Sequence, residues 1–190
     1  MDIEEAIYKR RTIRRFKQDP ISIDIMKKLI DYARVAPMGN NVQSLEYIII
    51  VTPEMREKVF PLLAWAGWLP IKQRVPEEGR RPTAYIIVLV NMDIKKIADS
   101  EEGGAVENIL LGAVKFGLGT CWMGSIDRKK LRTLLNIPEN YEIKHVISLG
   151  FPDEQSVMEP WKDSFKYWKD EKKIMHIPKR DLKEIIFKIS

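Results

Sequence analysis

The sequence predicts an α+β fold in which a central mixed β-sheet is flanked by helices. Two short apolar runs, at residues 47–51 and 84–90, have the length and composition of buried strands, and residues 144–149 are predicted to form a third strand. Segments with helical periodicity separate these runs, and residues 102–116 are apolar on most of their helical surface. A helix of this kind lies in a protein interior, so we expect a covered sheet.

The first third of the chain is expected to contain two helices and a loop. Residues 2–8 have apolar positions on one helical face. Ser22 is the expected N-cap of a second helix, whose apolar face consists of Met26, Leu29, Ile30 and Ala33. Residues 36–41 end this helix and form a loop before the first strand.

A third helix and an irregular segment follow the first strand. Pro53 stands at the first position of the helix, which is expected to run to about Leu63. Residues 64–83 show no clear periodicity and contain several Trp, Pro and Arg residues. An irregular segment of this length is often functional, and it is a candidate lid.

The second half of the chain begins with the apolar helix, for which Ser100 is the expected N-cap. A Gly-rich segment, residues 117–125, leads into a helix that is capped by Asp127 and ends near Pro138. After the third strand the chain is polar, aromatic and basic. We expect a last amphipathic helix, with an apolar face formed by Leu182, Ile185, Ile186 and Ile189.

Composition restricts the class of protein. The 190 residues suit one globular domain, residues 1–190. The sequence has no apolar run of the length of a transmembrane helix, and its N-terminus lacks the apolar core of a signal peptide. The single Cys121 favours a reducing cytoplasm. A net charge of +5 suits anionic ligands but is too mild to indicate nucleic acid.

Several common chemistries lack the residues that they need. His145 and His176 are the only histidines, lie far apart in sequence and have no metal-ligand partners at suitable spacing, so we predict no metal site. The sequence contains no Gly-x-Ser-x-Gly and no Walker A motif. Cys121 has no activating partner and is interpreted as a small buried residue. We therefore predict no catalytic side chain and expect a cofactor to perform the chemistry.

A basic cluster near the N-terminus points to an anionic ligand. Residues 9–15 contain five cations, which repel one another unless they are solvated or an anion lies among them. The fork of an Arg side chain fits a phosphate, and the hydroxyl of Thr12 can add a hydrogen bond. The alternative interpretation is a solvated basic face.

Four segments of the sequence form a recognisable set. They are Arg-Arg-Thr-Ile-Arg at residues 10–14, Ala-Pro-Met-Gly-Asn-Asn-Val-Gln at 36–43, residues 105–111 together with 117–124, and Ser-Leu-Gly-Phe-Pro at 148–152. Together, in this order and spacing, they resemble the FMN-dependent nitroreductase superfamily. The third, with its Glu-Asn helix and Gly-Leu-Gly-Thr-Cys-Trp loop, is the most specific.

The resemblance assigns cofactor-binding roles to fifteen positions. It implies that an FMN phosphate, ribityl chain and pyrimidine edge are held by Arg10, Arg11, Thr12 and Arg14. It implies that a loop reaches the FMN from the other subunit, with Pro37, Met38, Gly39, Asn41 and Gln43. The opposite face of the flavin would be covered by Trp122, Met123, Gly124 and Ser125, where a backbone N–H points at N5. A second basic pair for the phosphate would be Lys179 and Arg180.

Two departures from the family pattern affect the pocket. Met38 replaces a Ser, and Ser44-Leu45 replaces a Pro-Trp pair. The change beside the flavin is expected to alter the substrate rather than to abolish flavin binding. Trp65, Trp68 and Trp122 are candidates for apolar walls, and core packing is the alternative for the first two.

The resemblance also implies an intertwined homodimer with FMN at its interface. It implies ping-pong chemistry, in which NAD(P)H reduces FMN by hydride transfer to N5 and a small aromatic acceptor, such as a nitroaromatic or quinone, reoxidises it. Arg14 is the expected cation beside the reduced flavin.

Other functions remain open. Relatives on the same scaffold carry out reductive dehalogenation or breakdown of the flavin itself. A protein that binds flavin or nucleic acid without turnover is a further alternative, in which the basic tail at residues 166–180 would bind the nucleic acid.

Overall fold

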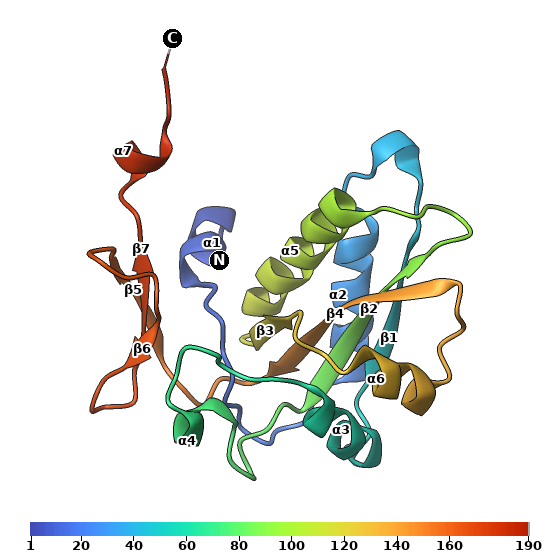
Figure 1. Cartoon of the computed structure of the whole chain (residues 1–190), viewed down its shortest axis with the longest axis horizontal. Helices are drawn as coiled ribbons and strands as arrows, with labels where there is room; N and C mark the ends of the chain where they lie inside the picture. Colours follow the sequence, from blue (N-terminus) through green and yellow to red (C-terminus); the bar gives the residue numbers. More distant parts are fainter. Residues whose placement is uncertain (190) are drawn as a thin grey trace.

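The computed structural model describes residues 1–189, apart from the side chain of Asp99, and contains two β-sheets (Figure 1). The strands of the larger sheet are, in spatial order, β1 (Leu45–Ile50), β2 (Ala84–Asn91), β4 (Tyr141–Gly150) and β3 (Gly119–Met123). All neighbouring pairs are antiparallel, so the prediction of a mixed central sheet was wrong. The continuous apolar runs that suggested it reflect burial of both faces, which does not depend on strand direction.

Helices cover both faces of this sheet (Figure 1). One face is covered by α2 (Ile23–Arg34) and α5 (Asp99–Lys115), and the other by α3 (Pro53–Val59), η2 (Phe60–Leu62) and α6 (Arg128–Leu135). Val106, Ile109 and Ala113 of α5 are fully enclosed, which confirms that α5 is an interior helix. In residues 1–189, no helix has the length and apolar character needed to cross a bilayer.

Side-chain caps set most helix starts where the sequence predicts them. Ser22 accepts a hydrogen bond from the N–H of Ile25 at 3.3 Å, and Asp127 accepts one from Lys130 at 3.1 Å. Asp2 caps α1 (Ile3–Lys9) in the same way. The prediction for Ser100 was wrong, because α5 begins at Asp99, after the buried Ala98, so that Ser100 lies inside the first turn and the helix has no side-chain cap.

The Gly-rich segment contains the edge strand β3, which the sequence analysis treated as a loop. Gly119 allows this strand to lie against the N-terminal segment, since a Cβ at Gly119 would come within 2.7 Å of Ile13. Gly119 is therefore required by the close approach of the N-terminal segment to this strand.

The polar, aromatic and basic C-terminal part, in which no strand was predicted, forms the second sheet. Its order is β5 (Ser156–Pro160), β7 (Met175–Lys179) and β6 (Trp168–Lys169), with β5 and β7 parallel. These strands are short, and two of them contain proline, which weakens a strand signal. The last helix, α7 (Leu182–Ile185), is shorter than predicted, because its apolar side chains have no surface to pack on within one chain.

Residues 64–83 contain only the short helix α4 (Ile71–Arg74) and are tied down at several points. Arg15, which is 4% exposed, pairs with Glu77 at 2.7 Å, and Arg80 pairs with Asp153. Leu69 packs with Met175 of the second sheet. The segment is therefore anchored to both ends of the chain in this conformation.

The Arg15–Glu77 pair predicts a pH dependence of stability. The hydrogen bond from Arg15 is the main cause that lowers the pKa of Glu77 from 4.5 to about 2. Because the folded-state pKa is depressed, this stabilisation is complete above pH ~4.5 and is lost as the pH falls towards 2. Glu77→Gln should lower the free energy of unfolding at pH 7 by about 1 kcal/mol, since Glu77 is exposed and solvent screens the pair.

The free energy of unfolding of the wild type and of Glu77→Gln, measured by urea unfolding between pH 7 and 2.5, tests this prediction. The difference between wild type and Glu77→Gln should shrink below pH ~4.5. A difference that stays constant over the whole range would show that Glu77 does not carry this dependence.

Candidate functional site

The basic N-terminal segment lies along the outer edge of β3. Thr12 forms a parallel bridge with Thr120, and the N–H of Ile13 donates to the carbonyl of Thr120 at 2.8 Å. An edge strand exposes backbone groups that need partners, and residues 12 and 13 supply them. The structure thus brings together two segments to which the sequence assigned ligand binding.

Two hollows lie at this junction. The first, of about 310 Å³, is lined by Arg10, Thr12, Glu107, Leu110, Thr120 and Trp122. The second, of about 380 Å³, shares Arg10 and Thr120 with it and also borders Arg11, Gly117 and Val157. Arg10, Thr12 and Trp122 had been predicted from the sequence, whereas Glu107, Leu110 and Thr120 had not. The signal for Thr120 is the alternation of side chains along β3, which appears once this segment is recognised as a strand.

The arginines of the cluster are only partly neutralised. Nε of Arg10 lies 3.5 Å from a carboxylate oxygen of Glu107. Burial, and then the charge of Arg10, lower the pKa of Arg11. Nε of Arg11 is buried and makes no hydrogen bond within the described chain. The cluster therefore has unused donors and excess positive charge.

Arg14 does not line the hollow with Trp122 and has different neighbours. Its guanidinium is 4.8 Å from the centre of the Tyr167 ring, and its backbone N–H donates to Glu154 at 2.6 Å. Its Nη1 is buried, with no hydrogen-bond partner in residues 1–189. Burial raises the pKa of the neighbouring Cys121 thiol, although the charge of Arg14 opposes this. Cys121 is thus a buried thiol, as interpreted from the sequence.

The residues at the end of β3 face in different directions. Trp122 is 39% exposed and borders the first hollow, whereas Met123 is buried in the core on the opposite face. Only the backbone of Met123 is therefore available to a ligand at that edge. Gly124 and Ser125 are exposed, and the N–H of Gly124 makes no backbone hydrogen bond within the described chain.

The predicted loop at residues 37–43 lies away from these hollows, beside the start of α5. It includes η1 (Gly39–Asn41), and the N–H of Gly39 donates to Glu101 at 3.3 Å. The side chains of Pro37, Asn41 and Gln43 are exposed, and Met38 is half-buried. Within one chain this loop does not contribute to the Arg10 site.

Lys179 and Arg180 line neither of the two hollows that Arg10 borders. Lys179 ends β7, and Arg180 donates to the carbonyl of Glu184 in α7 at 2.6 Å.

Of the three tryptophans proposed as walls, Trp65 packs in the core against Phe60, with ring centres 5.5 Å apart. Trp68 is exposed, and the ammonium group of Lys166 lies over its ring. Trp122 alone borders a hollow next to Arg10.

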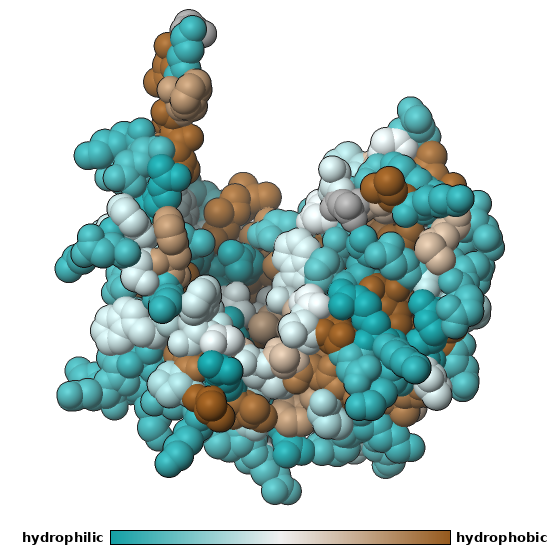
Figure 2. All heavy atoms as spheres, in the orientation of Figure 1, coloured by the Kyte–Doolittle hydropathy of each residue, from teal (hydrophilic) through white to brown (hydrophobic). Residues whose placement is uncertain are grey.

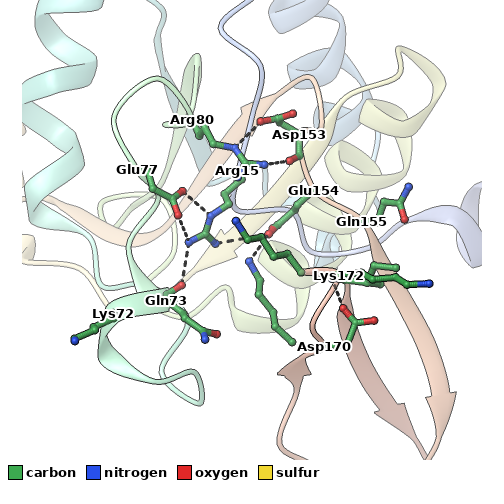
Figure 3. A pocket seen from close by; sticks show the side chains of 13 residues that line it. Arg15, Lys72, Gln73, Glu77, Arg80, Asp153, Glu154, Gln155, Asp170 and Lys172 are labelled. Carbon is green, nitrogen blue, oxygen red and sulfur yellow. Dashed lines mark hydrogen bonds and ion pairs between the residues drawn. The ribbon is translucent and has the colours of Figure 1, made fainter.

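A different cavity, of about 360 Å³, lies between residues 72–80 and the second sheet (Figure 3). Figure 3 shows Arg15 pointing towards Glu77 and Glu154, and Lys169 also binds Glu154 at 3.1 Å. None of the sequence-predicted cofactor residues lines it. Its charged groups are mostly paired with one another, so we interpret the cluster as an anchor. No group of three or more potential metal ligands occurs among the described residues.

The chain belongs to the nitroreductase family, whose sequence model matches residues 7–96 and 98–151. A protein of Archaeoglobus fulgidus, provisionally named an NADH dehydrogenase/NAD(P)H nitroreductase, is 31% identical over 159 residues, which cover 80% of this chain and 86% of that protein. The predicted family resemblance is thereby confirmed.

Solved structures share the fold. A provisionally assigned nitroreductase of Desulfovibrio desulfuricans, in complex with FMN, matches with a TM-score of 0.70 and 21% identity over 100% of this chain and 98% of its own. The NADPH:FMN oxidoreductase of Vibrio harveyi, in complex with NAD+, matches with a TM-score of 0.67 and 20% identity over 84% of this chain and 72% of its own. The second sheet lies beyond the part matched by the family model.

The burial of Cys121 predicts a protected thiol. Its raised pKa keeps the thiol protonated near neutral pH. Because the thiol is buried, a thiol-specific reagent can reach it only when the protein unfolds locally around it. If opening requires about 3 kcal/mol, reaction with a chromogenic disulfide should be on the order of a hundredfold slower in the native protein than in urea. Equal rates in the two states would contradict the buried position.

Proposed function

We propose that this protein is an FMN-dependent oxidoreductase that accepts hydride from NADH or NADPH and reduces a small aromatic acceptor, such as a nitroaromatic or quinone. Its family membership makes it an oxidoreductase. The observation that carries the proposal is the closure of the basic segment on the edge of β3, around a hollow lined by Arg10, Thr12 and Trp122. In this proposal residues 1–190 form one flavin-binding domain that works in the cytoplasm.

The unused donors of the site fit FMN. Nε of Arg11 and Nη1 of Arg14 are buried without hydrogen-bond partners, and a buried donor left unpaired costs about 1–3 kcal/mol. A phosphate among Arg10, Arg11 and Thr12 would relieve the repulsion between the two guanidinium groups. A pyrimidine edge offers acceptors that Arg14 can bind.

Bound FMN supplies the hydride chemistry, and the protein supplies binding and electrostatics. Arg10, Arg11 and Thr12 hold the phosphate end in this proposal, and Trp122 forms an apolar wall. The positive charge of Arg14 favours the reduced, more negative flavin. Cys121 is buried as a neutral thiol and has no part in the reaction.

A second copy of the chain would complete the site. Ile3, Ile7 and Tyr8 of α1 are exposed, and Ile3 is exposed by 73%. The C-terminal segment carries further exposed apolar side chains, namely Leu182, Ile185, Ile186, Phe187 and Ile189. Figure 2 shows this segment as a mainly apolar arm that projects from the body and borders a wide hollow. Large apolar surfaces of this kind mark interfaces, and a homodimer would cover them.

The first prediction of this proposal concerns the cofactor. The protein should purify with FMN and not FAD, and Arg10→Ala should weaken FMN binding by about 1.5–3 kcal/mol, because it removes a charged hydrogen bond. Fluorescence titration of the apoprotein measures the affinity. Arg34→Ala, which removes an exposed Arg of α2 paired with Asp31, is the control and should bind as wild type does. Unchanged affinity in Arg10→Ala would exclude Arg10 from the site.

The second prediction concerns assembly. Phe187→Asp should weaken dimerisation at least about tenfold, because it places a charge in an apolar interface, and FMN affinity should fall with it. Sedimentation velocity over a range of concentrations measures the dimer. Ile23→Asp, at an exposed position in the first turn of α2, is the matched control. A fully flavinated wild-type monomer would contradict the proposal.

The function itself is tested by anaerobic stopped-flow absorbance. NADH or NADPH should bleach the bound flavin, and a nitroaromatic or quinone should restore its colour. Arg14→Ala should slow bleaching by about tenfold to a hundredfold, because a stabilising charge is lost, whereas Cys121→Ser should stay within about tenfold of wild type. A flavin that neither nicotinamide bleaches would overturn the proposed activity.

A further inference from the structure

A buried acid–imidazole pair lies beneath the end of β3. Glu102, in the first turn of α5, is 3% exposed and forms a hydrogen bond with Nδ1 of His145 on β4. An ionised carboxylate can only accept a hydrogen bond, so this contact places the hydrogen of the imidazole on Nδ1. The other ring nitrogen, Nε2, is then directed away from Glu102.

A β-bulge gives His145 this orientation. His145 pairs with Val88, but Leu89 pairs with Ile143, so Lys144 is the extra residue on β4. The bulge lets Ile143 pack in the core under α3 and α6, while His145 faces α5 on the other side of the sheet. Bulges commonly re-aim a side chain in this way.

The imidazole contacts the part of β3 that the family pattern assigns to the flavin. The ring centres of His145 and Trp122 are 5.3 Å apart, at an interplanar angle of 79°. A Cβ built on Gly124 would lie 3.3 Å from Nε2 of His145. His145 therefore supports both the Trp122 ring and the Gly124 backbone, whose N–H makes no backbone hydrogen bond in the described chain.

The phenol of Tyr47 also lies close enough to the pair to feel the charge of Glu102. Tyr47 pairs with Val88 on the far side from His145, and its hydroxyl is buried without a hydrogen-bond partner in residues 1–189. Burial and the charge of Glu102 raise the pKa of Tyr47 to about 12, so it stays neutral. The adjacent Glu101 pairs with Lys95 instead. His145 is therefore the group that hydrogen-bonds Glu102.

The cost of this arrangement argues against a purely structural role. A carboxylate that is removed from water is unfavourable unless it is well paired, although the start of a helix partly stabilises it. His176 offers a contrast, since it also binds a carboxylate and stacks on a tryptophan, but its partners Glu159 and Asp170 keep about a quarter or more of their surface in solvent.

We propose that Glu102 and His145 act as one positioning unit that holds the Gly124 end of β3 for the flavin and links flavin binding to a proton, taken from solvent, on the His145 ring. The inference rests on the proposed flavin site. Glu102 fixes the ring and neutralises its charge when it is protonated. An anionic cofactor bound at the end of β3 would then favour the protonated ring.

The test uses nitrogen-15 NMR of the two imidazoles in the wild-type apoprotein, with FMN as the probe. FMN should shift the Nε2 resonance of His145 and raise the pH midpoint of its titration, while the resonances of His176 stay in place. Spectra of His145→Asn and His176→Asn assign the signals. This measurement needs no turnover and no destabilised variant.

FMN affinity as a function of pH provides the second readout. His145→Asn retains a donor for Glu102 but cannot titrate. The ratio of wild-type to variant affinity should therefore grow at least about threefold from pH 8 to pH 5.5, which is the linkage expected for one coupled proton. His176→Asn is the matched control and should follow wild type over the same range.

The outcomes separate the two proposals. FMN that binds to the wild type without moving the His145 signal, or an affinity ratio that is flat with pH, would overturn the positioning unit and leave the flavin site intact. A wild-type protein that binds no FMN would overturn both.

Discussion

The arrangement of this molecule depends on the closure of the open edge of β3 by residues 12 and 13. Thr12 forms a bridge with Thr120, and the N–H of Ile13 bonds to the carbonyl of Thr120. The next residues continue along the segment that follows β4, where the N–H of Lys17 donates to Phe151 and the carbonyl of Arg15 accepts from Asp153. An unpaired strand edge leaves backbone groups that need partners and invites aggregation. Thr12 and Ile13, which satisfy this edge, directly follow Arg10 and Arg11. The contact that closes the sheet therefore also brings the basic cluster to the edge of β3.

Much of the fold follows from the sequence, because its signals are local. The caps Ser22 and Asp127, the three apolar strands and the interior helix α5 each result from a short pattern that needs no distant contact. Strand direction was not predictable in this way, since burial on both faces gives the same apolar run in either orientation. β3 and the second sheet were missed because glycine and proline weaken strand signals, although at Gly119 the glycine is what the strand requires.

The candidate site was also predictable from the sequence only in part. The sequence identified Arg10, Thr12 and Trp122, which the structure gathers around one hollow, but it could not show that Met123 faces the core or that Arg14 lies beside Tyr167. Those facts depend on strand alternation and on the second sheet. No role in the site was predicted for His145, because its partner Glu102 is 43 positions away and nothing in the local sequence connects them. A bulge and a helix start bring them together.

The central claim is that the edge of β3 and the basic segment beside it, residues 10–14, together form the flavin site. Hydrogen–deuterium exchange of the apoprotein and the FMN-reconstituted protein tests it most directly, because the method locates the change along the chain. The account predicts that FMN slows exchange in residues 10–14 and 119–125 and leaves residues 128–135 of α6, on the opposite face of the sheet, unchanged. Protection confined to the cavity of Figure 3, with residues 10–14 and 119–125 unaffected, would contradict it.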